Sequence, residues 1–140
     1  MSWNIIKSDK DINELLCRFN HFHDSVLKEM NYSSGSFIEE DLNMIMVNNP
    51  KAHLIFQRQE SELPMIELLI EDIININIKP RDSSYTPEIY RAELYKKEDV
   101  IYWSEDVDYT NKNDCFWFAA KLMRWRERKN HFGDNYIFFE

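Results

Sequence analysis

Glycine is scarce in this chain, with two residues among 140, and proline is nearly as rare, with four. A chain so poor in both residues leaves no place for a flexible linker or a low-complexity tail. Two glycines also exclude a glycine-rich phosphate-binding loop. We therefore expect residues 1–140 to form a single globular domain.

Cysteine and long apolar runs are also lacking. Cys17 and Cys115 are too few for a disulfide framework, and we expect both to be small apolar groups in a reducing compartment. The first ten residues do not have the pattern of a signal peptide. Charged and amide side chains interrupt the most apolar stretch, residues 65–78, so that it cannot span a bilayer. These absences predict a cytoplasmic protein.

Positive charge is in deficit, because 17 lysines and arginines face 25 acidic residues and give a formal net charge of −8. Such a chain repels polyanions, which argues against binding to nucleic acid or to an anionic membrane. The same charge favours a basic protein partner.

Hydrophobic residues make up 44% of the chain and aromatic residues 14%, enough for a substantial core. The clearest local signal is a helix over about residues 9–19. Ser8 and Asp11 have the spacing of a capping box. The apolar residues that follow share one helical stripe, which we expect to pack on a sheet: Ile12, Leu15, Leu16 and Phe19.

After Asp24 the apolar period changes from that of a helix to that of a strand. A second series of alternating residues predicts a hairpin from Leu42 to Gln59, with its turn at residues 48–51. In the isoleucine-rich segment 65–78, the alternation shifts near Glu71 and predicts a bulge or bend. Further strands are expected at residues 26–32, at 90–94 with 100–103 as its partner, and at 115–126, although 115–126 also fits helical spacing.

The fold class that follows is α+β, mainly antiparallel β. We expect one N-terminal helix packed on a curved sheet of roughly six to eight strands, open or partly closed.

His21, His23 and Asp24 are the strongest candidates for a metal site. In an extended segment the two histidines would project to the same side, with the carboxylate beside them. Two imidazoles and a carboxylate suit zinc or iron, but further ligands are needed, and no other histidine or cysteine has a recognisable spacing. The alternative is structural, with Asp24 capping the turn between helix and sheet. The sequence shows no cofactor-binding motif and no catalytic set.

Basic residues alternate with aromatic and acidic ones over residues 121–129, a pattern that can grip single-stranded nucleic acid. The net charge of −8 favours a strand whose arginines pair with acidic neighbours instead. Trp103, Trp125 and Arg126 are therefore candidate contacts for a protein partner or a homo-oligomer. The acidic loop 105–114 resembles a calcium loop at its start, but Asn111 and Trp117 stand where glycine and glutamate are required.

Several short pieces together form a pattern that runs from about Ile12 to Arg126. The pattern resembles a family of small bacterial proteins, mostly from Firmicutes, for which the resemblance implies no activity, cofactor or partner. The size, acidity and β-rich pattern are also similar in type to immunity proteins of bacterial toxin systems. The pieces are Phe22-His23-Asp24-Ser25, Ser34-Gly35, Asp41-Leu42, Phe56-Gln57-Arg58-Gln59, Ile101-Tyr102-Trp103 and Trp125-Arg126.

These observations favour a non-enzymatic protein-interaction module, immunity-like in character, that binds a basic partner. A metal-binding domain or metal-dependent enzyme that uses His21, His23 and Asp24 is the alternative. A third hypothesis is a carrier with an apolar ligand cavity inside the curved sheet.

Overall fold

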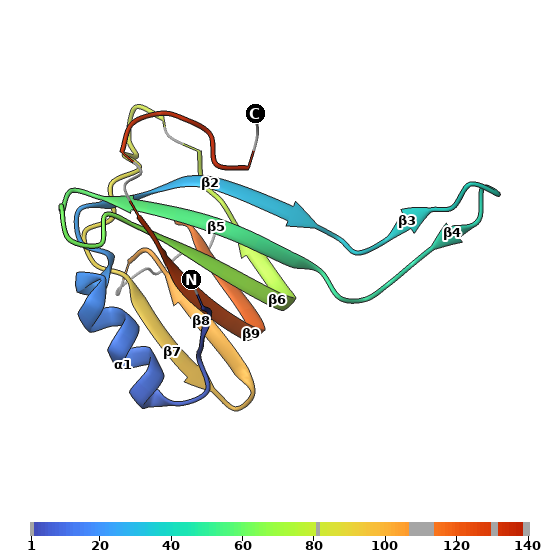
Figure 1. Ribbon diagram of the computed structural model, residues 1–140, viewed down its shortest axis with the longest axis horizontal. Coiled ribbons are helices and arrows are strands. Elements are labelled where there is room, and N and C mark those ends of the chain that lie inside the picture. Colours follow the sequence, from blue (N-terminus) through green and yellow to red (C-terminus); the bar gives the residue numbers. More distant parts are fainter. Residues whose placement is uncertain (1, 81, 107–113, 130–131, 139–140) are drawn as a thin grey trace.

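The computed structural model describes residues 2–80, 82–106, 114–129 and 132–138 (Figure 1). Helix α1 (Asp9–Arg18) follows its capping box as predicted. The Asp11 backbone N–H donates to Ser8 Oγ over 3.4 Å, and Asp11 Oδ2 accepts from the Ser8 backbone N–H over 3.0 Å. The Lys7 backbone N–H donates to the same carboxylate and lowers the pKa of Asp11. The helix buries its apolar stripe and lies alongside β7.

Seven strands form one open antiparallel sheet in the order β2-β5-β6-β9-β8-β7, with β1 paired to the free part of β9. Two further short strands, β3 and β4, pair only with each other. The predicted fold class is therefore confirmed. The strand bounds are β1 (Asn4–Ile5), β2 (Ser25–Ser33), β3 (Phe37–Ile38), β4 (Met44–Ile45), β5 (Lys51–Arg58), β6 (Met65–Asn77), β7 (Glu93–Lys97), β8 (Val100–Ser104) and β9 (Trp117–Arg128).

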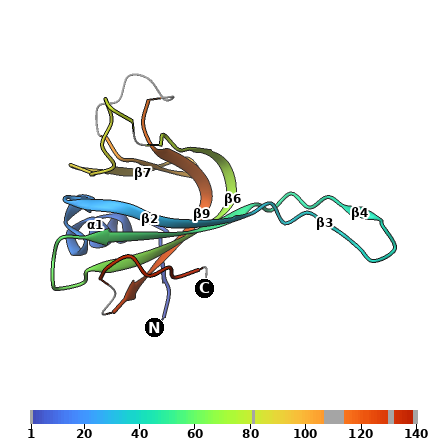
Figure 2. The ribbon, with the colours of Figure 1, turned by 90° about the horizontal axis from the view of Figure 1, so that it is seen from above.

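The sheet is curved (Figure 2). Aromatic side chains pack together in the core on its inner face. Trp103 stacks on Phe118 with 5.4 Å between ring centroids, and the edges of Phe22 and Phe56 close around it. The Trp103 indole nitrogen is buried without a hydrogen-bond partner among the described residues. Burial of these large rings contributes to the hydrophobic stabilisation of the domain, together with the aliphatic residues of the core.

Three predicted features of the strands are confirmed. β9 is a strand and not a helix, because it pairs with β6 along its length. β6 is irregular near the predicted bend, where Asp72 has a φ of 50° and the pairing with β9 shifts between Ile73 and Asn75. β7 and β8 form a hairpin.

The predicted hairpin from Leu42 to Gln59 is wrong. β5 pairs with β2 on one side and with β6 on the other, whereas β4 pairs with β3. Alternation identifies a segment as a strand but does not identify the strand with which it pairs. Here Ser33 at the end of β2 pairs with Lys51 at the start of β5. Residues 34–50 therefore leave the sheet as a separate hairpin and return to it.

Within the described part of the chain, no helix has the length and apolar character needed to cross a membrane.

Candidate protein-binding arm

The segment that carries the predicted metal ligands is not extended. Asn20–Phe22 form a single turn in the left-handed region, with φ between 47° and 63°, and Asp24 has a φ of 57°. Such angles cost side-chain-bearing residues about 1–3 kcal/mol each. The Asp24 backbone N–H donates to the Ile89 carbonyl over 3.0 Å and helps to hold the turn. The turn drives Phe22, fully buried, into the core as the chain reverses from α1 into β2.

The metal hypothesis requires an extended segment in which His21 and His23 project to the same side. The turn removes that extended conformation. His23 Nδ1 lies 2.7 Å from the Tyr90 carbonyl oxygen, and His23 Nε2 lies 3.2 Å from Asp24 Oδ2. Burial lowers the pKa of His21 and disfavours its protonated form. Among the residues that the structure describes, no three histidine, cysteine or acidic side chains are arranged to hold a metal ion.

The other candidate ligands are scattered. His53 lies on β5 and pairs with Glu67, Cys17 is exposed on α1, and Cys115 is buried. His131 lies outside the described residues, as do residues 107–113 of the acidic loop.

The prediction that Trp103 and Trp125 contact a partner is wrong. Their exposed fractions are 1% and 2%, because both side chains pack into the main hydrophobic core, together with Phe118 and Met123 of β9. Arg126 lies on the outer face, where its guanidinium carbon is 4.3 Å from the centre of the Trp3 ring and its side chain binds Glu67.

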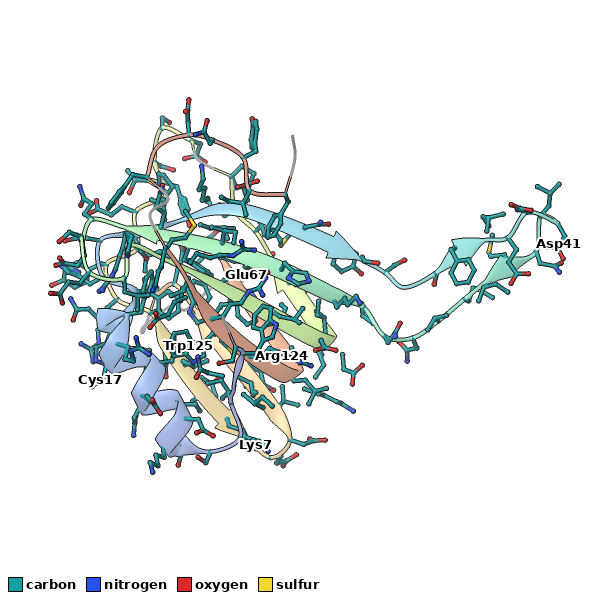
Figure 3. The ribbon with its side chains drawn as sticks, in the orientation of Figure 1. Lys7, Cys17, Asp41, Glu67, Arg124 and Trp125 are labelled. Carbon is teal, nitrogen blue, oxygen red and sulfur yellow. The ribbon has the colours of Figure 1, made fainter. Side chains whose placement is uncertain are left out.

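Glu67 is the centre of a charged cluster on that outer face (Figure 3). Its carboxylate is 1% exposed and accepts hydrogen bonds from Arg126 and Arg128 of β9, while His53 of β5 lies on its other oxygen. Burial raises the pKa of Glu67, but the hydrogen bonds from these partners outweigh burial and hold the pKa below its usual value. The cluster joins three strands, and each side chain is satisfied by another. We therefore assign the cluster a structural role.

Tyr85 and Glu105 form a second polar pair, beside a cavity of about 150 Å³. The Tyr85 hydroxyl donates to the Glu105 carboxylate. Burial and the neighbouring carboxylate raise the pKa of Tyr85, and burial also raises the pKa of Glu105. The Tyr85 hydroxyl thus satisfies the half-buried Glu105 side chain without an external ligand.

Residues 34–50 form the most unusual surface of the molecule, a hairpin that projects well beyond the sheet in both ribbon views (Figures 1 and 2). We call this segment the arm. Each leg has about eight residues and so extends roughly 25 Å from the sheet. Asp41 marks its far end in Figure 3. Most large apolar side chains of the arm face solvent: Phe37 (53% exposed), Ile38 (56%), Leu42 (82%), Met44 (65%), Met46 (81%) and Val47 (38%).

Specific contacts hold the arm in this shape. At its base Gly35 has a φ of 85°, a left-handed conformation in which a residue with a Cβ would be strained. Ser36 Oγ accepts from the Val47 backbone N–H over 3.1 Å and joins the two legs. At the tip the Asp41 side chain accepts from the Asn43 backbone N–H over 3.0 Å. The arm is thus an organised element.

Charge is distributed unevenly along the arm. Glu39, Glu40 and Asp41 stand together at the tip, and no lysine or arginine occurs between Lys28 and Lys51. The tip is therefore strongly acidic, whereas the legs are apolar.

A groove of about 490 Å³ lies where the arm joins the sheet. We call it the root groove. Tyr32, Ile74 and Ile78 in its lining are 43–54% exposed, so the apolar surface of the arm continues into the groove. Nine large apolar side chains of arm and groove are thus at least 38% exposed, whereas exposed apolar side chains on a protein surface are normally scattered singly. The full lining is Met30, Tyr32, Pro50, Ile73, Ile74, Asn75, Ile76 and Ile78.

Comparison with family models, with curated proteins and with solved structures finds no match to this chain.

The sequence did not predict the arm, because the alternating residues 42–46 were expected to pair with the segment that forms β5, whereas β4 pairs with β3. The signals that could have found it are Gly35, the turn-forming Asp41-Leu42-Asn43 at the tip, and the long stretch without basic residues.

Proposed function

We propose that the protein is a non-enzymatic protein-interaction module, and that its arm docks into an apolar cleft of another protein. The single observation that carries this proposal is the exposure of six large apolar side chains on a hairpin that its own contacts keep in shape. A large apolar surface facing water is characteristic of an interaction site.

The charge of the arm defines the partner further. The tip carries three carboxylates, and the legs carry no cation. These charges favour a cleft that has basic side chains at the end that receives the tip. The net charge of −8 adds long-range attraction to a basic protein. An immunity-like role, in which an acidic protein neutralises a basic toxin, is the form of this proposal that agrees with the size and charge of the chain.

Affinity capture from a lysate of the source cells, with matched variants, tests the proposal. In the arm variant, Phe37→Ser and Met46→Ser remove side chains that are 53% and 81% exposed. In the control variant, Leu122→Ser and Tyr90→Ser remove side chains that are 50% and 79% exposed elsewhere on the surface. We expect wild type and control to retain the same basic protein and the arm variant to lose it. If all three chains retain the same proteins, the arm is not the docking element.

A further inference from the structure

The segment of residues 132–138, near the C-terminus, is tied to β2 and β5. We call it the strap, and Figure 1 shows it alongside β2. At one end of the strap the Lys28 ammonium group of β2 donates to the Gly133 carbonyl oxygen over 3.1 Å. At the other end the centre of the Phe138 ring lies 6.0 Å from that of the His53 ring on β5. The strap thus crosses two neighbouring strands of the sheet.

Glu29 of β2 is the main anchor of the strap. It pairs with Ile55 of β5, on the face of the sheet away from the main core, and is only 7% exposed. Glu29 Oε2 accepts from the Ile137 backbone N–H over 2.6 Å, and Glu29 Oε1 accepts from the Phe138 backbone N–H over 3.2 Å. No other described residue donates a hydrogen bond to this carboxylate. A buried carboxylate needs such donors, so this position is suited to the main chain of an extended peptide.

The strap fills its position on the sheet only in part. Its side chains Phe132 and Tyr136 are 60% and 69% exposed. A cleft of about 510 Å³ lies between the strap and the sheet, where Phe132 and Gly133 face Val26 of β2 and Gln57 of β5. A segment with so little buried apolar surface belongs to the parts of a protein that open at low cost in free energy.

We propose that the strap occupies a peptide-binding site of its own chain, and that an extended segment of another protein displaces it. That segment offers two consecutive main-chain N–H groups to Glu29 and an aromatic side chain to His53, as Phe138 does here. Its neighbouring side chains enter the cleft that the strap leaves open, and they supply contacts that the strap lacks. The site contains no residue of the arm, so this inference goes beyond the proposed function and is independent of it.

A peptide with the sequence of residues 132–138, blocked at both ends and labelled with a fluorophore, is the probe. Its anisotropy is measured in titrations with the full chain. Ile137→Pro removes the N–H that donates to Glu29 over 2.6 Å and leaves the site itself unchanged. Ile137→Ala is the matched control, because it shortens the same side chain but keeps the N–H. Hydrogen exchange at the Phe138 amide reports the opening of the strap in each chain.

We expect faster exchange in Ile137→Pro than in Ile137→Ala, together with at least about tenfold tighter binding of the peptide, because the site is then free in a larger fraction of molecules. Addition of Glu29→Gln to Ile137→Pro should weaken binding at least about tenfold, since an amide has one accepting oxygen where the carboxylate has two. The arm variant, Phe37→Ser with Met46→Ser, should bind the peptide as wild type does.

The proposal is overturned if Ile137→Pro and Ile137→Ala exchange at the same rate or bind the peptide equally, or if no chain binds it. Binding that is unchanged by Glu29→Gln also overturns it. None of these results affects the proposed function, which depends on capture of a basic protein through Phe37 and Met46. Conversely, a capture that is indifferent to the arm leaves the peptide-binding site standing.

Discussion

Replacement of Glu67 by glutamine is the sharpest test of what holds the sheet together. Glu67 Oε1 accepts from Arg126 Nε over 3.0 Å and from Arg128 Nη2 over 2.6 Å, and Oε2 lies 2.6 Å from His53 Nδ1. Its carboxylate is 1% exposed, whereas the two arginines are each 28% exposed. Glutamine keeps the shape and one accepting oxygen but removes the charge that these partners share.

The loss should be large for a single substitution. Removal of one partner from a buried ion pair costs about 3–5 kcal/mol, because the remaining charges stay desolvated. Both arginines are partly exposed, so water can solvate them in the variant and reduce this cost. We therefore expect a loss of about 2–3 kcal/mol in the free energy of unfolding. For a domain of this size, such a loss lowers the melting temperature by roughly 10 °C.

The loss should also depend on pH in one direction. The pKa of Glu67 is below its usual value in the folded protein, so its contribution is complete above the pKa of the unfolded chain and disappears as the pH falls through the folded value. Denaturant unfolding of wild type and Glu67→Gln should therefore give a full difference at neutral pH and a smaller one in strong acid.

Glu71 provides the matched control, since it lies on the same face of β6 and binds one arginine, Arg124, over 2.6 Å. Its side chain is 28% exposed, and Glu71→Gln should cost no more than about 1 kcal/mol. Equal losses for the two variants, or a Glu67→Gln loss that is unchanged in acid, would refute the reasoning from burial and charge.

Two further predictions concern local elements. Ser8→Ala removes the acceptor for the Asp11 backbone N–H and should cost about 1 kcal/mol in the free energy of unfolding, measured by denaturant titration; an unchanged midpoint would show that the capping box is dispensable. Glu105→Gln tests the opposite sign of pH dependence. Burial raises the pKa of Glu105, so its contribution is complete below the unfolded pKa and is lost as the pH rises through the folded value. The melting temperature of Glu105→Gln should therefore rise relative to that of wild type between pH 4 and pH 8. A difference that stays constant over this range would contradict the assignment.

The sequence predicts the secondary structure of this protein better than its pairing. The capping box and apolar stripe define α1 because both are local, and the bend near Asp72 follows from the shifted alternation in β6. The partner of β4 is not a local property. The same period of two suits a strand that pairs with β3 outside the sheet and one that continues into β5.

The candidate site was misplaced for a related reason. Aromatic residues are enriched both in cores and at interfaces, so their presence does not decide between the two. Trp103 and Trp125 are buried in the main core, whereas the exposed apolar side chains of the arm include one aromatic residue, Phe37, beside methionines such as Met46. Likewise, His21 and His23 were grouped on the assumption of an extended segment, and the turn at Asn20–Phe22 shows that the segment is not extended.

No residue of the arm belongs to the hydrophobic core, which agrees with the docking role proposed for it. A two-stranded hairpin by itself is marginally stable in water, and this one leaves most of its apolar side chains exposed. Its order comes from a few specific contacts, among them the hydrogen bond between Ser36 and Val47 and the one between Asp41 and Asn43. A surface that is already ordered loses less conformational entropy when a partner binds. Docking of the arm into an apolar cleft, as proposed above, would remove this exposed apolar surface from water.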